Sequence, residues 1–452
     1  MIHRFECVPP SEGPEFPSVP PACSLRIATP SQPRRRQALT EGSLLPWLAL
    51  LLLLCHLPAR AVQAGDWPQL LGPARNGVAT KEQLLDKLPE GGPRVLWQRS
   101  VGDGFAGVAV QGPRGVLFHR VAGEEVAEGF DPTTGEVAWT RKFPASYSGS
   151  LASDQGPRCV PLLHEGSVYL CGAAGDLHCL ALDDGSVKWS RGLGREWKAP
   201  EGYFGIGSTP VIAGDLLLWN AGAPGGRGVV ALSRKTGETA WQATNEQASY
   251  SSPIVADVAG RSQAIFVTRL QCLALDPPTG KVLWQFPFGA RGPTVNAATP
   301  LLLGDLLFVS ASYGVGAHCA RLTGEGPVEV WSNNETLSSQ YTTGVVVEGK
   351  LYGIDGRADT GGARLRCVDP ATGRVLWTVA DFGVANLIAA DGKLLLLKDN
   401  GTLVLAQADP ARYRELGSHR VLKSTTRALP ALAAGRLFVR DERQLVVLGV
   451  GR

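Results

Sequence analysis

The sequence carries little net charge and lacks the residue patterns that mark several common kinds of active site. Its 452 residues include 44 Lys and Arg against 41 Asp and Glu, a formal net charge of +3. No segment after the N-terminal region has a long basic run, which argues against a nucleic-acid-binding protein. No two cysteines are spaced as C-x-x-C, and no serine has nucleophile-elbow spacing, so a zinc site and a hydrolase are both without support. No catalytic residue and no metal ligand is predicted.

A hydrophobic run long enough to cross a membrane comfortably is missing too. The apolar run at residues 44–57 has 14 residues, whereas a spanning helix needs roughly 20. The run follows an arginine cluster at 34–36 and precedes a small-residue stretch that ends at Ala64, which is the order of a signal peptide. We therefore predict that residues 1–64 are an N-terminal extension and signal peptide, cut after Ala64; an uncleaved anchor is the alternative. The mature chain would be exported to the periplasm or the extracellular space, with no integral membrane span.

Cleavage at Ala64 would reduce the nine cysteines to six: Cys159, Cys171, Cys179, Cys272, Cys319 and Cys367. An exported protein can pair such cysteines, and Cys171 and Cys179 flank an expected tight turn, so they are the best candidates for a bridge. The last four cysteines fall at nearly the same place in a repeat and are expected as small, buried strand residues. His178 and His318 each precede one of them, but equivalent positions in different repeats are far apart, so a metal site is not expected there.

Seven tryptophans recur along the chain at steps of 42, 50, 52, 43, 47 and 46 residues: Trp97, Trp139, Trp189, Trp241, Trp284, Trp331 and Trp377. A period of about 40 to 50 residues is typical of one four-stranded blade of a β-propeller.

The residues before each tryptophan repeat as well. Residues 129–139, 274–284 and 367–377 read GFDPTTGEVAW, ALDPPTGKVLW and CVDPATGRVLW. A strand should end at the Asp, whose side chain can accept hydrogen bonds from the turn, and the Gly supplies a positive φ. The large ring that follows can pack against the neighbouring blade, where its burial is worth roughly 2–4 kcal/mol. The seven tryptophans are therefore predicted to dock the blades onto one another.

Counting the repeats predicts an all-β, eight-bladed β-propeller over residues 65–452. Residues 386–416 form a seventh unit, in which Leu416 stands where the tryptophan is expected, and residues 429–450 form an eighth that lacks an outer strand. The strand that ends at Trp97 has no blade before it. It should complete the C-terminal blade and close the ring; seven blades is the alternative.

The repeated Ala-x-Asp-x-x-Thr-Gly-x-x-x-Trp resembles the docking motif of the quinoprotein repeat, which is named for pyrroloquinoline quinone (PQQ). Residues 66–78 are also similar to the opening of exported propellers of that family. The resemblance implies the propeller fold but no single activity. The family contains PQQ- and calcium-dependent alcohol and sugar dehydrogenases, and non-catalytic relatives that include the lipoprotein of the outer-membrane β-barrel assembly machinery. The vicinal Cys-Cys pair of the dehydrogenases is absent, and no motif assigns a calcium site, so no cofactor is expected.

One insertion, residues 192–207, combines charged and aromatic residues in the way that binding surfaces often do. Its candidate binding residues are Arg195, Trp197, Lys198, Tyr203 and Phe204. An ordinary ordered loop is the equal alternative. The favoured hypothesis is an exported scaffold that binds another envelope or secreted protein, and the alternative is a PQQ- and calcium-dependent alcohol or sugar dehydrogenase.

Overall fold

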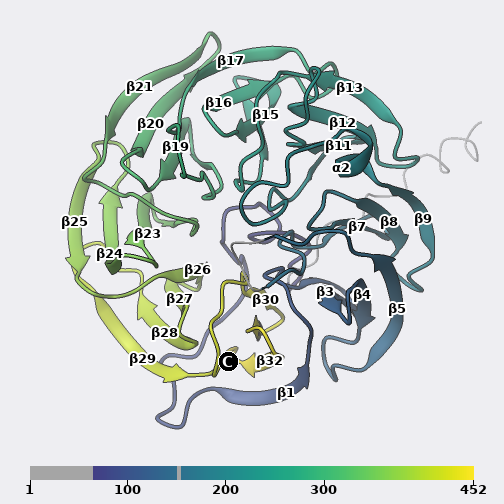
Figure 1. Ribbon diagram of the computed structural model, residues 1–452. Coiled ribbons are helices and arrows are strands. Elements are labelled where there is room, and N and C mark those ends of the chain that lie inside the picture. The colour runs from purple at the N-terminus through teal and green to yellow at the C-terminus, as the bar shows by residue number, and fades with distance from the viewer. Residues whose placement is uncertain (1–64, 150–153) are drawn as a thin grey trace, which may run out of the picture. The chain divides into compact units, whose positions relative to one another are not determined.

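Residues 65–149 and 154–452 are described by a computed structural model, and within them 32 strands form eight antiparallel sheets of four strands each. Figure 1 shows the sheets arranged around one axis as the blades of a propeller. The strands have three to nine residues and many of them are rich in Val, Leu and Ile, residues that suit a pleated and half-buried surface. The predicted fold class, an all-β propeller with eight blades, is therefore confirmed. The predicted N-terminal extension and signal peptide, residues 1–64, lies outside the described residues.

Blades are numbered here in chain order. Blades 1 to 4 contain β2 (Ala109–Gln111), β3 (Arg114–Val121), β4 (Glu124–Phe130) and β5 (Val137–Pro144); β6 (Leu162–His164), β7 (Ser167–Cys171), β8 (Leu177–Ala181) and β9 (Val187–Arg191); β10 (Val211–Ala213), β11 (Leu216–Trp219), β12 (Val229–Ser233) and β13 (Thr239–Ala243); and β14 (Ile254–Val258), β15 (Arg261–Val267), β16 (Gln271–Leu275) and β17 (Val282–Pro287). Blades 5 to 7 contain β18 (Leu301–Leu303), β19 (Leu306–Ala311), β20 (Gly316–Thr323) and β21 (Gly326–Asn333); β22 (Val345–Val347), β23 (Lys350–Arg357), β24 (Gly361–Asp369) and β25 (Arg374–Val379); and β26 (Ala385–Ala390), β27 (Lys393–Lys398), β28 (Thr402–Gln407) and β29 (Arg414–Arg420).

The eighth blade is built from two distant parts of the chain. Its first three strands are β30 (Ala431–Ala433), β31 (Arg436–Arg440) and β32 (Gln444–Gly449), and its outer strand is β1 (Arg94–Ser100). In the register of this pair, Trp97 lies opposite Val447. The outer strand that precedes the first blade in the sequence thus belongs to the sheet of the last one.

The ring has two unlike faces, because the strands of a blade alternate in direction. One face carries the turns between the first and second strands and between the third and fourth strands; we call it the turn face. The other carries the hairpins between the second and third strands and the connectors from one blade to the next; we call it the connector face. In the described residues the single helix, α2 (Leu193–Glu196), lies in the connector between blades 2 and 3.

Every outer strand contains a β-bulge at the same place. In all eight blades the register between the third and fourth strands shifts by one residue. In blade 6 the extra residue is Leu376, directly before Trp377. In blade 7 it is Leu416, and Gly417 occupies the position of the tryptophan. The prediction that Leu416 replaces the tryptophan is therefore wrong by one residue. Gly417 follows Asp409 by eight residues, the same spacing as from Asp131 to Trp139, so the motif itself places Gly417 at the tryptophan position and Leu416 in the bulge.

The hydrophobic core lies between the blades rather than within them. One buried cluster combines Phe118 and Ala127 of blade 1 with Val168 and Leu180 of blade 2. Other clusters join later neighbours in the same way, such as Ile265 of blade 4 with Leu307 of blade 5. A single twisted sheet cannot bury both of its faces, so each blade is stabilised by the next one.

Residues 66–92, which we call the N-terminal strap, run across the middle of the ring before β1 begins; Figure 1 shows them as the purple trace. Hydrogen bonds tie the strap to blades 1, 3, 7 and 8: Trp67 N to Val110 O (2.8 Å), Arg75 Nη1 to Pro210 O (3.0 Å), Ala79 N to Ala389 O (2.8 Å) and Ala434 N to Glu82 Oε1 (2.8 Å). Arg75 is almost fully buried, and this burial lowers the pKa of its guanidinium to about 9. The strap therefore holds together blades that lie far apart around the ring.

No helix in residues 65–149 and 154–452 has both the length and the apolar character to cross a membrane.

Candidate functional site

Most of the turns between the third and fourth strands share one construction, which places them against the preceding blade. In blade 1, Asp131 Oδ1 accepts hydrogen bonds from the backbone amides of Thr133 (2.6 Å) and Thr134 (3.2 Å), and Gly135 N donates to Asp131 O (2.8 Å). Gly135 has a φ of +81°, and a Cβ there would lie 2.7 Å from Trp97 of the preceding blade. Glycine is thus required both for the backbone conformation and for the close approach of the ring.

The recurring tryptophans contact these turns. Six of the seven donate the indole N–H to a backbone carbonyl in the turn of the following blade: Trp97 to Pro132 (3.1 Å), Trp139 to Leu182 (2.9 Å), Trp189 to Arg234 (3.0 Å), Trp241 to Pro277 (2.9 Å), Trp331 to Pro370 (2.7 Å) and Trp377 to Asp409 (2.9 Å). Each indole therefore adds a directional bond to the apolar contact that its ring makes.

Two seams between blades depart from this rule. Trp284 donates to Gln263 Oε1 of its own blade (2.7 Å), and the turn that follows it in blade 5 has the loosest version of the motif. Blade 7 has no tryptophan, and the backbone at Gly417 is instead covered by Leu88 of the strap, at 3.0 Å from the place of a Cβ. Leu88 N also donates to Leu416 O (3.0 Å). A residue from the N-terminal strap thus takes the place that a tryptophan side chain fills elsewhere.

The candidate binding loop, residues 192–207, lies on the connector face between blades 2 and 3. Helix α2 is anchored by Leu193, which is fully buried, and by Gly194 N, which donates to Gly175 O of blade 2 (3.2 Å). Gly194 approaches the carbonyl of Ala174 so closely that a Cβ would collide with it. The loop is therefore held firmly at its start.

The structure separates the five predicted binding residues. Trp197 is buried in the core between blades 2 and 3, with the guanidinium of Arg227 5.7 Å from its ring. Arg195 and Lys198 are exposed. Only Tyr203 lines a pocket, and Phe204 packs behind it, with ring centroids 6.4 Å apart.

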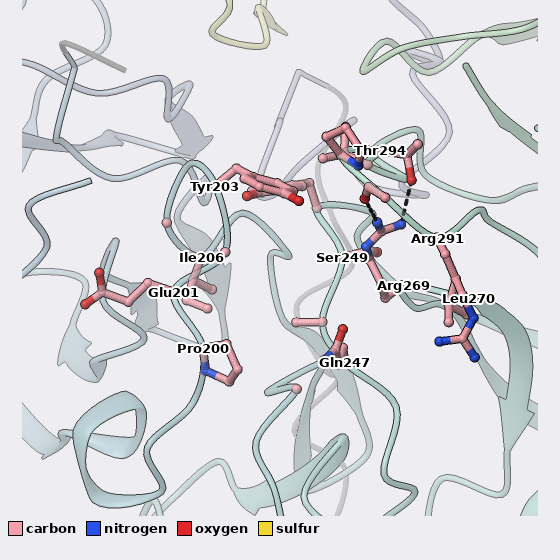
Figure 2. A pocket seen from close by; sticks show the side chains of 18 residues that line it. Pro200, Glu201, Tyr203, Ile206, Gln247, Ser249, Arg269, Leu270, Arg291 and Thr294 are labelled. Carbon is pink, nitrogen blue, oxygen red and sulfur yellow. Dashed lines mark hydrogen bonds between the residues drawn. The ribbon is translucent and has the colours of Figure 1, made fainter. Parts of the chain in front are cut away.

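This pocket, which we call the connector pocket, has a volume of about 610 Å³. It is formed by residues within 200–206, 247–250 and 291–295 from three connectors, and by hairpin residues 222 and 269–270. Figure 2 shows Pro200 and Glu201 on one side of it and Arg269, Leu270 and Arg291 on the other. Three segments from different blades therefore meet around one hollow.

Hydrogen bonds to backbone carbonyls and to one hydroxyl group hold the Arg269 side of the pocket in place. Arg269 Nη1 donates to Ala290 O (2.8 Å) and to Thr294 Oγ1 (2.7 Å), as Figure 2 shows for Thr294. Asn296, which is buried, donates from Nδ2 to Thr268 O (2.8 Å). On the near side, Phe204 N donates to Tyr250 Oη (2.8 Å). The pocket is consequently pre-formed and does not depend on a bound molecule for its shape.

The sequence reasoning missed Tyr250, Arg269 and Arg291. They lie in connectors and hairpins of blades 3 to 5, outside the insertion at residues 192–207. A usable signal was the glycine- and proline-containing stretch 289–293, which forms one wall of the pocket. Its proximity to residue 203 depends on the ring and cannot be read from local composition.

A second polar cluster lies at the connector-face end of the seam between blades 1 and 2. Glu125 on β4 accepts a hydrogen bond from Ala173 N of blade 2 (2.7 Å). Burial raises the pKa of Glu125 to about 7, helped by Asp176 and opposed by the Ala173 amide and by Arg120. This carboxyl group therefore joins two blades on the face opposite to the tryptophan contacts.

The two His-Cys pairs have equivalent packing in their blades. His178 stacks on Phe143 with ring centroids 3.8 Å apart, and His318 stacks on Phe286 at 4.5 Å. Each histidine thus lies against an aromatic residue of the preceding blade. In the described part of the chain, no three or more His, Cys, Asp or Glu side chains are grouped so that they could hold a metal ion.

The six cysteines of the propeller are free and buried, so the predicted bridge between Cys171 and Cys179 is wrong. The strand register gives the reason: Cys171 lies opposite Leu177, and Cys179 lies opposite Tyr169. The two cysteines are therefore diagonal neighbours, whose Cβ atoms are roughly 7 Å apart, whereas a disulfide needs about 4 Å.

The fold and the repeated turn together define the class of the protein, an eight-bladed propeller of the PQQ-repeat type. More particularly, the chain belongs to the family described as outer membrane protein assembly factor BamB, whose model matches residues 122–379. The resemblance inferred from the repeated motif is thereby confirmed.

Two curated relatives carry that same description. The protein from Salmonella typhimurium is 27% identical over 262 residues, which cover 54% of this chain and 62% of the relative. The protein from Burkholderia pseudomallei is 25% identical over 286 residues, which cover 54% of this chain and 70% of the relative. The chain thus matches less than two thirds of the length of the Salmonella relative.

Solved structures agree on the fold. BamB from Moraxella catarrhalis has a TM-score of 0.57 at 15% identity, covering 79% of this chain and 99% of the other. A europium-containing methanol dehydrogenase has a TM-score of 0.65 at 14% identity, covering 86% of this chain and 90% of the other. At these identities both likenesses show the propeller architecture and no activity.

Whether the described residues suit PQQ with calcium can be judged from their oxygen atoms. Calcium requires roughly six to eight oxygen ligands, several of them usually carboxylates. The buried carboxylate of Asp154 on the connector face already accepts hydrogen bonds from Gly104 N (2.6 Å) and Gly156 N (2.9 Å), and from Arg158. The two oxygen atoms of Asp154 are therefore already engaged by protein donors, and binding of PQQ with calcium is left to the titration described below.

Proposed function

We propose that the chain is exported and acts in the cell envelope as a scaffold that binds another protein during outer-membrane protein assembly. Family membership supports the process, since the relatives are named for assembly of outer membrane proteins. The observation that carries the proposal is the connector pocket, a pre-formed hollow on the face where the non-repeating connectors meet.

The residues that line the connector pocket have the composition of a protein interface. Tyrosine and arginine are enriched at the centres of such interfaces, whereas lysine and glutamate are depleted. The pocket lining has two tyrosines, Tyr203 and Tyr250, and two arginines, Arg269 and Arg291, against one acidic residue, Glu201, and no lysine. A volume of about 610 Å³ would admit a few side chains of a partner.

Rigidity of the pocket is a second argument for binding. Ordering a loop on association costs free energy, and a surface that is already ordered avoids this cost. The bonds of Arg269, Asn296 and Tyr250 hold the connectors before any partner arrives. Tyr203, which is 40% exposed at the rim, is left free to contact a partner.

Site-specific photocrosslinking of the full-length chain in its own cells tests the proposal. A photoreactive residue would replace Tyr203, and a matched control would replace Val328, which is similarly exposed but lies on the outer strand β21. We expect the Tyr203 position, and not the Val328 position, to crosslink to a protein of the outer-membrane assembly process, identified by mass spectrometry. Equal adducts at both positions, or none at Tyr203 in a folded protein, would contradict the proposal.

The dehydrogenase alternative calls for a separate titration. A ligand at about 100 times its dissociation constant adds roughly 2.7 kcal/mol to the stability of the protein that binds it. We expect no such shift when the purified chain is melted with PQQ and Ca²⁺. A saturable rise in melting temperature with stoichiometric quinone uptake would favour the enzyme.

The export step is checked by the intact mass of the chain recovered from the cell envelope. Cleavage by signal peptidase should leave a protein that begins at Gly65. Recovery of the uncleaved chain would favour the alternative of an N-terminal anchor.

A further inference from the structure

The hairpin between β7 and β8 of blade 2, residues 172–176, joins blade 1 to the wall of the connector pocket. On one side, Ala173 N donates to Glu125 Oε1 of blade 1 (2.7 Å). On the other side, Ala173 O accepts a hydrogen bond from Ile206 N (2.8 Å), and Ile206 is one of the residues that line the pocket. The backbone of one residue therefore bonds both to a carboxyl group of blade 1 and to the candidate binding loop.

The hairpin fits closely between these two neighbours. Glu125 is 3% exposed, and a Cβ at Gly172 would collide with its Oε2 atom. Gly205 in the loop has a φ of +78°, and a Cβ there would lie 2.9 Å from Ala173 O. Contacts of this kind transmit a displacement, because a close-packed interior yields little. A movement of the hairpin should therefore move the loop that carries Tyr203.

We propose that Glu125 is a positioning residue of the connector pocket. Its carboxyl group holds the hairpin and, through Ala173, the backbone of Ile206, and its state of protonation sets how tightly the pocket binds a partner. The proposal rests on the scaffold function proposed above and adds how the affinity of that same pocket is regulated. Glu125 lies on β4 and outside the pocket lining, so it acts on a partner only through the hairpin.

Charged and titratable groups face Glu125 from the elements packed against it. Asp176 in the hairpin repels a negative charge on Glu125, whereas Arg120 of β3 and Arg158 of the connector between blades 1 and 2 attract it. Cys171, at the end of β7, stays a neutral thiol because burial raises its pKa well above the usual range. Ionisation of Glu125 would thus place its charge beside a second carboxyl group.

Both arginines are already committed to other groups. Arg120, which lies opposite Glu125 in the register of β3 and β4, donates from Nη1 to Tyr147 O (2.7 Å). Arg158 Nη1 donates to Asp154 Oδ1 (3.0 Å). In the described part of the chain, a charge on Glu125 would therefore be buried without an ion-pair partner, and a shift of the hairpin that admits water would relieve it.

The direction of the pH effect follows from these surroundings. Burial raises the pKa of Glu125 to about 7 from its ordinary value of 4.5, opposed by the Ala173 amide and helped by Asp176. In a released hairpin, with water at the carboxyl group, the pKa returns towards 4.5. The held arrangement is therefore favoured most below about pH 4.5, and it loses up to about tenfold per pH unit against the released one as the pH rises to 7. Binding of a partner should weaken over this range.

Methyl NMR of the purified chain tests the coupling without any partner. Isoleucine δ1 methyl groups are labelled, and the signal of Ile206 is assigned with Ile206→Val. Between about pH 5 and 8, this signal should titrate in the unchanged chain and stay constant in Glu125→Gln, whose amide is neutral throughout. Glu124→Gln, which changes a half-exposed carboxyl group on the same strand, should titrate like the unchanged chain. An Ile206 signal that is independent of pH, or that titrates equally in Glu125→Gln, would overturn the proposal.

Asp176→Asn identifies the titrating group while Glu125 stays in place. Removal of the facing carboxyl group should lower the pKa of Glu125, so the titration of the Ile206 signal should persist but move to lower pH. Loss of the titration in Asp176→Asn would assign it to Asp176 and contradict the role of Glu125.

Affinity for the partner found by crosslinking separates this inference from the scaffold proposal. Between about pH 5.5 and 7.5, the unchanged chain should lose roughly tenfold more affinity than Glu125→Gln. Equal pH dependence in the two proteins would contradict regulation through Glu125 and leave the scaffold role standing. Absence of binding by both proteins at both pH values would contradict the scaffold role, and the methyl titration alone would then decide whether Glu125 positions the loop.

Discussion

The two faces of the ring are built on different principles. On the turn face, one arrangement recurs in five seams: a tight turn with a glycine of positive φ lies under a tryptophan of the preceding blade, and the indole donates to that turn. In a sixth seam Trp377 donates to Asp409 O in a turn that has no glycine. On the connector face nothing repeats. The connectors differ in length and composition, and three of them enclose the connector pocket.

The turn face therefore contributes to stability, whereas the connector face is the one that can recognise a ligand. A contact that recurs in nearly every seam contributes to packing wherever it occurs and cannot distinguish one ligand from another. Loops that differ between blades are free to vary because the turn face already holds the blades together. Substitutions on the two faces should therefore have different effects, which are ordered below from the largest change in stability to the smallest.

The largest effect is expected for Trp139→Ala on the turn face. Trp139 is 7% exposed and donates to Leu182 O of blade 2. Loss of the ring and its hydrogen bond should lower the free energy of unfolding by about 3–5 kcal/mol, measured by denaturant titration. Trp139→Phe, which keeps an aromatic ring, should lose only about 1–2 kcal/mol. Equal losses in the two variants would contradict a role for the ring's bulk.

A substitution in the seam between blades 7 and 8 tests whether the N-terminal strap takes the place of a tryptophan there. Leu88 is buried over Gly417, so Leu88→Ala should cost about 2–3 kcal/mol. The exposed neighbour Lys87 is the control, and Lys87→Ala should change stability by less than about 0.5 kcal/mol. A Leu88→Ala protein as stable as the control would mean that this seam does not need the strap.

Two carboxyl groups on strand β4, those of Glu125 and Glu128, should affect the pH dependence of stability in opposite directions. The pKa of Glu125 is about 7 in the folded protein against 4.5 in the unfolded chain. Between pH 4.5 and 7 the carboxyl group of Glu125 is protonated in the folded protein but ionised in the unfolded chain. The contribution of Glu125 to stability is therefore complete below about pH 4.5 and is lost as the pH rises through 7. Glu125→Gln should remove this slope, a change on the order of 1–3 kcal/mol at pH 8.

Glu128 is the control of opposite sign. Burial alone would raise the pKa of Glu128, but the nearby His119 ring (Nε2 at 3.6 Å) and the hydrogen-bonded guanidinium of Arg99 lower it to about 2. Its contribution is therefore present above about pH 4.5 and is lost as the pH falls towards 2. When the free energy of unfolding is plotted against pH, the slope for Glu128→Gln should differ from that of the unchanged protein only at acid pH. Identical pH profiles for the two variants would show that neither group has the assigned environment.

The smallest change in stability is expected for Tyr203→Ala at the rim of the connector pocket. Tyr203 is 40% exposed, so its removal should alter the free energy of unfolding by less than about 0.5 kcal/mol. Binding to the partner identified by crosslinking should nevertheless weaken by about tenfold or more, measured by titration. Unchanged affinity, with Arg291→Ala equally silent, would move the interface away from this pocket.

The sequence predicted the propeller well because the signals that define it are local. The Asp and Gly of the turn and the tryptophan that follows are within about ten residues of one another in each copy, and their spacing reveals the blade period. The predictions failed where one residue of register mattered. Leu416 was placed one residue away from the tryptophan position, and Cys171 was paired with a diagonal neighbour.

The candidate site was predicted only in part, and the reason is also physical. The insertion at 192–207 does contribute Tyr203 to the connector pocket, but composition alone could not tell that Trp197 turns inward to the core. Tyr250 and Arg291 come from other connectors, and their nearness to Tyr203 arises from the curvature of the ring.

The sequence by itself thus determined the class of fold and the construction of the repeated turn, because these depend on short-range backbone chemistry repeated many times. The choice of eight blades over seven was settled by the structure. Only the tertiary structure decided which connectors enclose a pocket and which residue of the strap covers Gly417. Those arrangements join residues that are tens to hundreds of positions apart, and they are set by the closure of the ring rather than by any local pattern.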